Sequence, residues 1–126
     1  MADEVDINRL AQAVMTELED YRDLAAEDLK KAIKRAGDTV KQQIKEKAPK
    51  LTGEYSKSWK VRKQYETSGS IGLIVYSPTK YSLAHLLEHG HAKRGGGRTR
   101  AFPHIAPAEE IGEEQLLRDI EKALGG

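Results

Sequence analysis

Two histidines and a glutamate at helical spacing are the residues of this sequence that most resemble a catalytic set. They are His85, Glu88 and His89, in the pattern H-x-x-E-H. Histidines four residues apart lie on one helical face and can bind one zinc ion, and the glutamate can act as base toward zinc-bound water. The pattern is short, and His89 is followed at once by Gly90, which would leave its ligand geometry loose. We therefore expect no catalytic residues and no zinc enzyme.

A narrower role for metal remains open in the sequence. A structural or adventitious ion could use some of the histidines. However, a histidine in the last turn of a helix also hydrogen-bonds free carbonyls and complements the helix dipole without any metal. We therefore predict no metal site and no cofactor. The histidines concerned are His85, His89, His91 and His104.

A glycine- and arginine-rich loop, residues 91–100, follows these histidines. It lacks GK[ST] and does not follow a strand, which excludes a P-loop. Its positive charges could dock on an acidic protein surface, contact nucleic-acid phosphates, or simply remain solvated. Single aromatic residues flank the loop, which does not support a stacking platform for single strands. Protein docking is the preferred interpretation, and the residues that we expect to dock are His91, Lys93, Arg94, Arg98 and Arg100.

Composition limits what the whole chain can be. Its 126 residues predict a single domain, residues 1–126, in which residues 1–20 could form a separate or mobile N-terminal helix. The 21 basic and 20 acidic residues nearly cancel, so the chain as a whole is not a basic nucleic-acid binder. The absence of cysteine excludes disulfides and cysteine zinc sites. Because no apolar run is long enough to span a bilayer and no secretion signal is evident, we expect a soluble intracellular protein without a membrane partner.

Apolar residues that recur every three or four positions predict one long helix or a pair of helices between residues 6 and 48. A break is expected near residues 19–23, where Asp20 or Asp23 could cap the second helix. Pro49 should end that helix, because a residue before proline is pushed out of the helical conformation. The expected inward residues are Ile7, Leu10, Ala11, Val14, Leu18, Tyr21, Ala25, Leu29, Ile33, Ala36, Val40 and Ile44, and the expected solvated basic face is Lys30, Lys31, Lys34, Arg35, Lys41 and Lys45.

The period then changes to two, which predicts a β-hairpin of residues 55–66 and 71–77. Its apolar face should pack on the long helix. On the first strand this face should carry Tyr55, Trp59, Val61 and Tyr65, and on the second Ile71, Leu73 and Val75.

The last third of the chain predicts two more helices separated by the basic loop. Residues 79–89 should form a short helix, with Gly90 as its left-handed stop. The loop of residues 91–100 should be mobile because of its glycines, and a C-terminal helix should span 108–124. The fold class is α+β. The inward residues of the two helices should be Leu83, Leu86, Leu87, Ile111, Leu116, Ile120 and Leu124.

Two parts of the chain resemble a known protein family. The stretch APKLTGEYSKS (48–58) resembles P-x-x-T-G-x-[LY]-x-x-S. YSLAHLLEHG (81–90) resembles Y-a-x-x-x-E-x-G, with two more residues between the tyrosine and the glutamate. After the loop, FPHIAPAE (102–109) is similar to P-F-x-x-P-A-x-E, with Phe102 and Pro103 in reversed order and Pro107-Ala108 one position later. These are motifs of the HK97 gp10-like family of tailed-phage proteins, and their order and spacing agree from about Ala25 onward.

The resemblance implies a minor structural protein of a phage or prophage. It would act in tail completion or head–tail joining at the neck, as a ring of copies that could start as monomers in the host cytoplasm. Its partners would be head-completion, tail-terminator or tail-tube proteins, and any DNA contact would not be specific. The alternative is a nucleic-acid-binding module that uses the basic loop and the basic helix face.

The resemblance also implies structural roles for individual residues of the motifs. Thr52 and Gly53, after Pro49, would shape the turn into the hairpin. Glu88 and Gly90 would end the short helix. The residues that would anchor the return of the loop are Phe102, Pro103, Pro107 and Ala108.

Overall fold

The computed structural model describes residues 3–16, 18, 24–50 and 53–125, and these form the α+β fold that the sequence predicts. Both strand pairs of the small sheet are antiparallel, in the order β1-β3-β2. No helix in these ranges is long and apolar enough to cross a membrane. The elements are β1 (Val5–Asp6), α1 (Ile7–Thr16), α2 (Ala26–Lys47), α3 (Glu54–Lys57), β2 (Lys60–Glu66), β3 (Ile71–Tyr76), α4 (Tyr81–His89) and α5 (Ile105–Ala123).

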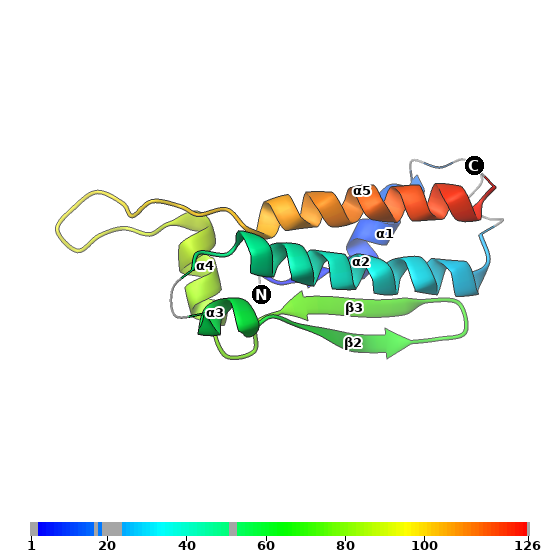
Figure 1. The fold of residues 1–126 in the computed structure, drawn as a ribbon, viewed down its shortest axis with the longest axis horizontal. Coiled ribbons are helices and arrows are strands. Elements are labelled where there is room, and N and C mark those ends of the chain that lie inside the picture. Colours follow the sequence, from blue (N-terminus) through cyan, green and yellow to red (C-terminus); the bar gives the residue numbers. More distant parts are fainter. Residues whose placement is uncertain (1–2, 17, 19–23, 51–52, 126) are drawn as a thin grey trace.

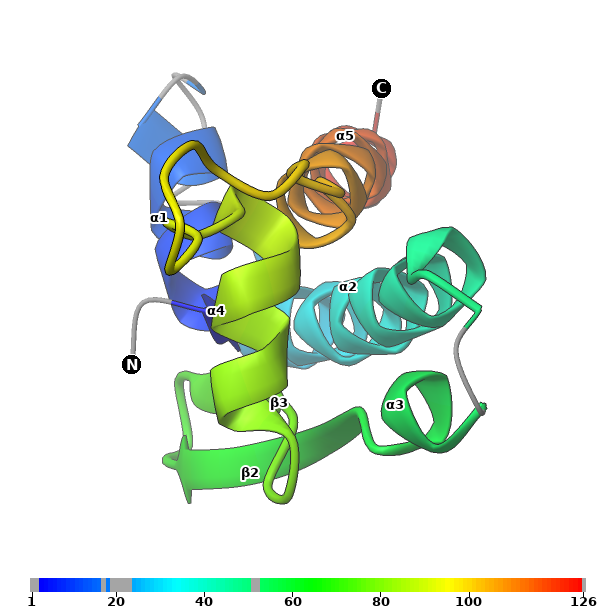
Figure 2. The ribbon, with the colours of Figure 1, turned by 90° about the vertical axis from the view of Figure 1, so that its left-hand side faces the viewer.

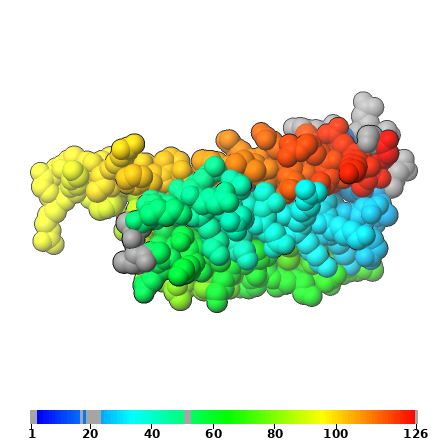
Figure 3. All heavy atoms as spheres, viewed as in Figure 1, coloured from blue at the N-terminus to red at the C-terminus, as the bar shows by residue number. Residues whose placement is uncertain are grey.

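Helix α2 is the centre of the fold. It lies between α5 on one side and the β2–β3 hairpin on the other, while α1 packs against α5, β3 and α2 (Figures 1 and 2). Helix α4 lies at one end of this arrangement. The loop of residues 91–100 extends beyond α4 and away from the body of the protein (Figures 1 and 3).

Of the two predicted alternatives, a long N-terminal helix or a helix pair, the structure has the pair, α1 and α2. Helix α2 ends at Lys47, and Ala48 is extended (φ −64°, ψ 145°), as expected for the residue before Pro49. The predicted cap is wrong, because the N-cap residue of α2 is Ala25, which makes no side-chain cap bond. Residues 19–23, with both proposed aspartates, lie outside the described residues, as does Tyr21. Helix α1 contributes to the same core as α2 and α5 through Ile7, Leu10, Ala11 and Val14, and the single-domain organisation stays a prediction.

The contact between α2 and α5 depends on a glycine. A Cβ atom added to Gly112 would lie 2.3 Å from Cγ2 of Val40, so the two helices approach closely only because Gly112 has no side chain. Val40 is fully buried and belongs to the main hydrophobic core. No hydrophobic pattern in the sequence indicates this close approach.

One lysine of the predicted solvated face is buried. Lys30 is 9% exposed, and its Nζ lies 3.1 Å from Oε2 of Glu66 at the end of β2. This ion pair joins the start of α2 to the sheet. A buried lysine is tolerated because the carboxylate balances its charge.

The first predicted strand begins five residues later than expected, at Lys60. Tyr55 lies in the single helical turn α3, and Trp59 lies just before β2; both are 2% exposed. Serine hydroxyls favour this turn, because Ser56 donates to the carbonyl of Gly53 and Ser58 to that of Tyr55. Such local side-chain bonds compete with strand formation, which is why the alternating pattern misplaced the strand.

A β-bulge breaks the predicted alternation on β2. Lys63 pairs with Leu73, but Tyr65 pairs with Gly72, which leaves Gln64 as the extra residue. The extra residue moves Tyr65 to the face opposite Val61, where its ring covers Gly72. The prediction that Tyr65 shares the inward face is therefore wrong.

Helix α4 turns a different face inward than predicted. Leu86 is 40% exposed, and the buried residues are Ala84 and Glu88, with Leu83 and Leu87 partly buried beside them. A buried glutamate on the inward face needs polar partners. These partners belong to the start of α5.

Candidate docking hairpin and its buried anchor

The loop of residues 91–100 forms a projecting hairpin, which we call the basic hairpin. The backbone N–H of Thr99 donates to the carbonyl of His91 (2.8 Å), and the N–H of His91 donates to the Thr99 hydroxyl (2.9 Å). Nearer the tip, the N–H of Lys93 donates to the carbonyl of Gly97 (2.9 Å). These bonds give the basic hairpin a defined stem, whereas its predicted mobility stays a prediction.

The charged side chains of the basic hairpin all face solvent. Within the described ranges none of these cations forms an ion pair. One of them, the Arg100 guanidinium, lies over the ring of Phe102 at 5.4 Å, a cation–π contact that leaves its charge unneutralised. The basic hairpin thus presents concentrated positive charge without an internal counterion. The exposed residues are His91, Lys93, Arg94, Arg98 and Arg100.

The base of the basic hairpin is fixed to the end of α4. Gly90 has φ of +69°, and a Cβ atom there would lie 2.7 Å from the carbonyl oxygen of Thr99, so any other residue would be strained and would clash. On the returning strand the N–H of Phe102 donates to the carbonyl of Leu87 (2.7 Å). The Phe102 ring itself is 42% exposed, so its backbone anchors the return.

Glu88 links the two ends of the basic hairpin. Its Oε1 accepts the backbone N–H groups of His104 and Ile105, both at 2.8 Å, and its Oε2 accepts that of Ala106 at 3.0 Å. The next residue, Pro107, has no N–H to satisfy. The first amides of a helix lack partners within the helix and carry its positive dipole end, so the carboxylate caps α5. The resemblance implied that Glu88 would end α4; α4 ends at the next residue, His89, and the Glu88 side chain also caps the following helix.

This cap explains why α5 begins at Ile105 and not at the predicted residue 108. The prolines of the AFPHIAP segment argued against a helix there. Three of its amides find an acceptor on α4, and Pro107 occupies the first turn, where a missing N–H costs nothing. Ala108 is then fully buried in the core.

The surroundings of Glu88 keep its carboxylate charged. Burial alone would raise its pKa, but hydrogen bonds from the His104 side chain and from the backbone N–H groups of His104, Ala106 and Ile105 outweigh burial. Together they lower the pKa of Glu88 from 4.5 to about 2. The anchor is therefore ionised at any pH that a cell provides.

A buried tyrosine completes the anchor. His104 is fully buried, and its Nδ1 lies 2.7 Å from the carbonyl oxygen of Phe102 and 3.1 Å from Oε1 of Glu88, both of which can only accept. Nδ1 therefore carries the proton, and in the neutral ring Nε2 accepts from the Tyr55 hydroxyl at 2.5 Å. Burial raises the pKa of Tyr55, so its hydroxyl remains a donor. The network joins α3, α4 and α5 beneath the basic hairpin.

The H-x-x-E-H residues separate in the structure. Glu88 turns toward α5, whereas His85 and His89 lie side by side on the outer face of α4, with ring centroids 4.9 Å apart. A glutamate held by three backbone amides cannot serve as base for a water molecule on these histidines. Their partner is Asp3, just before β1, whose position beside α4 no sequence pattern indicated.

The remaining motif residues occupy structural positions. Gly53 has φ of +91° and precedes α3, while Thr52 lies outside the described residues. Pro49 follows the end of α2, and Pro103 is exposed between the basic hairpin and α5. A sequence signal for the contact between Glu88 and the start of α5 would have been the joint presence of the E-x-G and P-A-x-E motifs.

Comparison with known proteins agrees with the resemblance. The family model described as "Bacteriophage HK97-gp10, putative tail-component" matches residues 12–90, which is more than half of the chain. The match starts within α1, earlier than the motifs, and ends at Gly90, so residues 102–109 lie outside it. No similar curated protein and no similar solved structure was found.

Proposed function

Because the chain belongs to the HK97 gp10-like family of phage tail components, we propose that it completes the tail or joins head to tail at the neck of the virion. It does so as an oligomeric ring of identical copies. Each copy docks through its basic hairpin, residues 91–100, onto an acidic surface of a neighbouring head-completion, tail-terminator or tail-tube protein.

The observation that carries this proposal is the basic hairpin. It projects from the body of the protein (Figure 3), and its cations have no internal counterion among the described residues. Projecting, unneutralised charge favours association with a surface of opposite charge and orients the encounter. The anchor beneath it, built on Glu88, holds both ends of the basic hairpin at a fixed place on the fold.

A ring makes a small docking element sufficient. One basic hairpin offers too little contact area for a stable interface, and ordering its side chains costs conformational entropy. When several copies sit on one partner ring, the later contacts form at high effective concentration. The chain can therefore remain monomeric in the host cytoplasm and bind stably only at the assembly site.

Charge reversal in the basic hairpin tests this role. We expect the triple substitution Lys93→Glu, Arg94→Glu, Arg98→Glu to lower the infectious titre of a complemented deletion phage roughly a hundredfold or more, because each 1.4 kcal/mol lost at an interface is a factor of ten. The purified variant should keep the wild-type thermal unfolding temperature, since all three side chains are exposed. Plaque counts and the amount of the protein in purified particles measure the effect.

The matched control places the same charge change elsewhere, at Lys31→Glu, Lys34→Glu and Lys60→Glu, which are exposed on α2 and β2. This control should complement normally. If both triple variants complement equally well, the basic hairpin does not dock. If the hairpin variant enters particles normally but loses salt-sensitive DNA binding, nucleic acid is the partner instead.

A further inference from the structure

A second cluster of side chains lies on the other face of α4, away from the Glu88 anchor. His85 and His89 converge on Asp3, which comes from the opposite end of the chain. Nδ1 of His85 lies 2.7 Å from Oδ2 of Asp3, and Nε2 of His89 lies 2.9 Å from Oδ1. We propose that this cluster is a binding site for a divalent transition-metal ion of the zinc class.

The geometry of the three groups suits such an ion. Their ligand atoms lie within 4.8 Å of one another. In a tetrahedral zinc site with bonds of about 2.1 Å, neighbouring ligand atoms are about 3.4 Å apart. Small side-chain rotations therefore bring all three atoms onto one ion. The histidines are four residues apart on α4, which places both on one helical face.

The burial of Asp3 adds a reason for a cation. Its side chain is only 9% exposed, and within the described ranges its partners are His85 and His89, with no lysine or arginine among them. A carboxylate with so little exposure is stabilised by a positive charge close by. A divalent ion supplies that charge while both histidines bind it in the neutral form.

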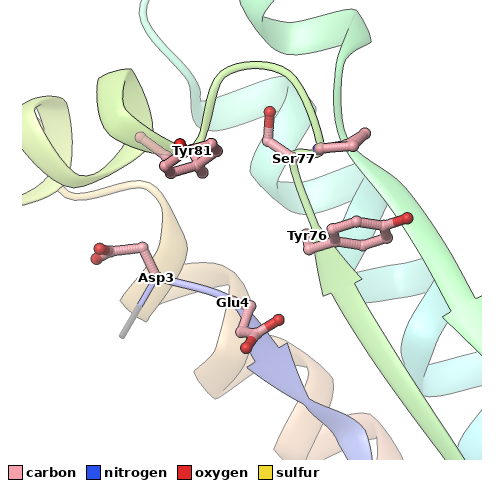
Figure 4. A pocket seen from close by; sticks show the side chains of 7 residues that line it. Asp3, Glu4, Tyr76, Ser77 and Tyr81 are labelled. Carbon is pink, nitrogen blue, oxygen red and sulfur yellow. The ribbon is translucent and has the colours of Figure 1, made fainter. Parts of the chain in front are cut away.

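The site differs from the zinc enzyme that the sequence pattern suggested. Glu88 is committed to the α5 cap, so it is not available as a base for water at this cluster. Its third ligand comes instead from Asp3, at the wall of a cleft of about 400 Å³ that Tyr76, Pro78 and Tyr81 also line (Figure 4). Bound metal would thus join the N-terminal segment to α4. This role is structural and is independent of the proposed docking through the basic hairpin.

Calorimetric titration of the untagged full-length chain with ZnCl₂ tests the site. We expect one Zn²⁺ to bind per chain and to raise the thermal unfolding temperature, because an ion that binds only the folded state stabilises it. His85→Ala and Asp3→Asn should each weaken zinc binding at least about tenfold. Removing a group that only orients a metal ligand already lowers metal affinity by about that factor. Asn keeps the shape of Asp3 but removes its charge.

The matched control is His91→Ala, which removes an exposed histidine of the basic hairpin outside the cluster. This variant should bind zinc as the wild type does. Circular dichroism of all variants without zinc verifies that they are folded. The proposal is overturned if the wild type shows no stoichiometric binding, or if His85→Ala and Asp3→Asn bind zinc as tightly as His91→Ala. The charge-reversed variant of the basic hairpin should still bind zinc normally if it fails to dock. That result would show that the metal site and the proposed docking are independent.

Discussion

Replacing Glu88 with glutamine is expected to lower the free energy of unfolding at pH 7 by about 3 kcal/mol, because lowering a pKa from 4.5 to about 2 corresponds to about 1.4 kcal/mol per unit. Glutamine keeps the shape of the side chain but loses the charge that three backbone amides and His104 bind. The midpoint temperature should fall by roughly 10 °C for a chain of this size. Urea unfolding and thermal unfolding measure both quantities.

The pH dependence of the same variant gives an internal control. The pKa of Glu88 is lower in the folded chain than its ordinary 4.5, so its contribution is fully present above pH 4.5 and is lost as the pH falls through about 2. The stability difference between wild type and Glu88→Gln should therefore shrink over that window. Glu110→Gln, on the exposed face of α5, should stay within about 0.5 kcal/mol of wild type. Equal stability of Glu88→Gln and wild type at pH 7 would refute the anchor.

Placing a side chain at Gly112 is expected to destabilise the fold by about 3 kcal/mol, the upper part of the range for overpacking a core. In Gly112→Leu the new Cβ atom would meet the fully buried Val40 at 2.3 Å, and the stiff β-branched valine cannot turn away. Helices α2 and α5 would have to separate. Urea unfolding of Gly112→Leu measures the loss.

Two control experiments test whether the clash with Val40 causes this destabilisation. Gly69→Leu changes a glycine that has no atom within 4 Å of the added Cβ position, and it should cost far less. In a Val40→Ala background, Gly112→Ala should become neutral or stabilising, because the clash is gone and alanine favours the helix by about 1 kcal/mol over glycine. Gly112→Ala could instead lower the free energy of unfolding as much in the Val40→Ala background as in the wild-type chain. That result would mean that a contact other than Val40 limits the side chain at position 112.

Periodicity predicted the large elements well for a physical reason. Helices α1 and α2, β3 and α5 each bury apolar residues, and burying one face imposes the spacing that a sequence shows. Pro49 and Gly90 mark helix ends because proline restricts the backbone and glycine permits a positive φ, and both effects are local. The order of elements could therefore be predicted from residues that act within a few positions of one another.

Periodicity failed where a local or a distant contact overrode the pattern. Serine hydroxyls turned the region of Tyr55 into α3, and the extra residue Gln64 reversed the side chains that follow it. Lys30 is buried because Glu66, 36 residues away, meets it. None of these features changes the hydrophobic pattern enough to be visible in the sequence.

The candidate sites divide in the same way. The charges and glycines of the basic hairpin are contiguous, so the sequence alone locates it. The Glu88 anchor and the histidine–aspartate cluster depend on partners 16 to 18 and 82 to 86 residues away. The spacing of His85, Glu88 and His89 predicted that they lie on one helix. Only the three-dimensional structure shows that Glu88 caps α5 while the two histidines face Asp3.

Electron microscopy of lysates from a phage or prophage that lacks this gene tests the proposed role most directly. A function in tail completion or head–tail joining predicts filled heads and full-length tails that lie unjoined. Supplying the wild-type gene from a plasmid should restore joined, infectious particles, and supplying the charge-reversed basic hairpin should not. Normal, infectious particles in the absence of the gene would contradict the proposed role.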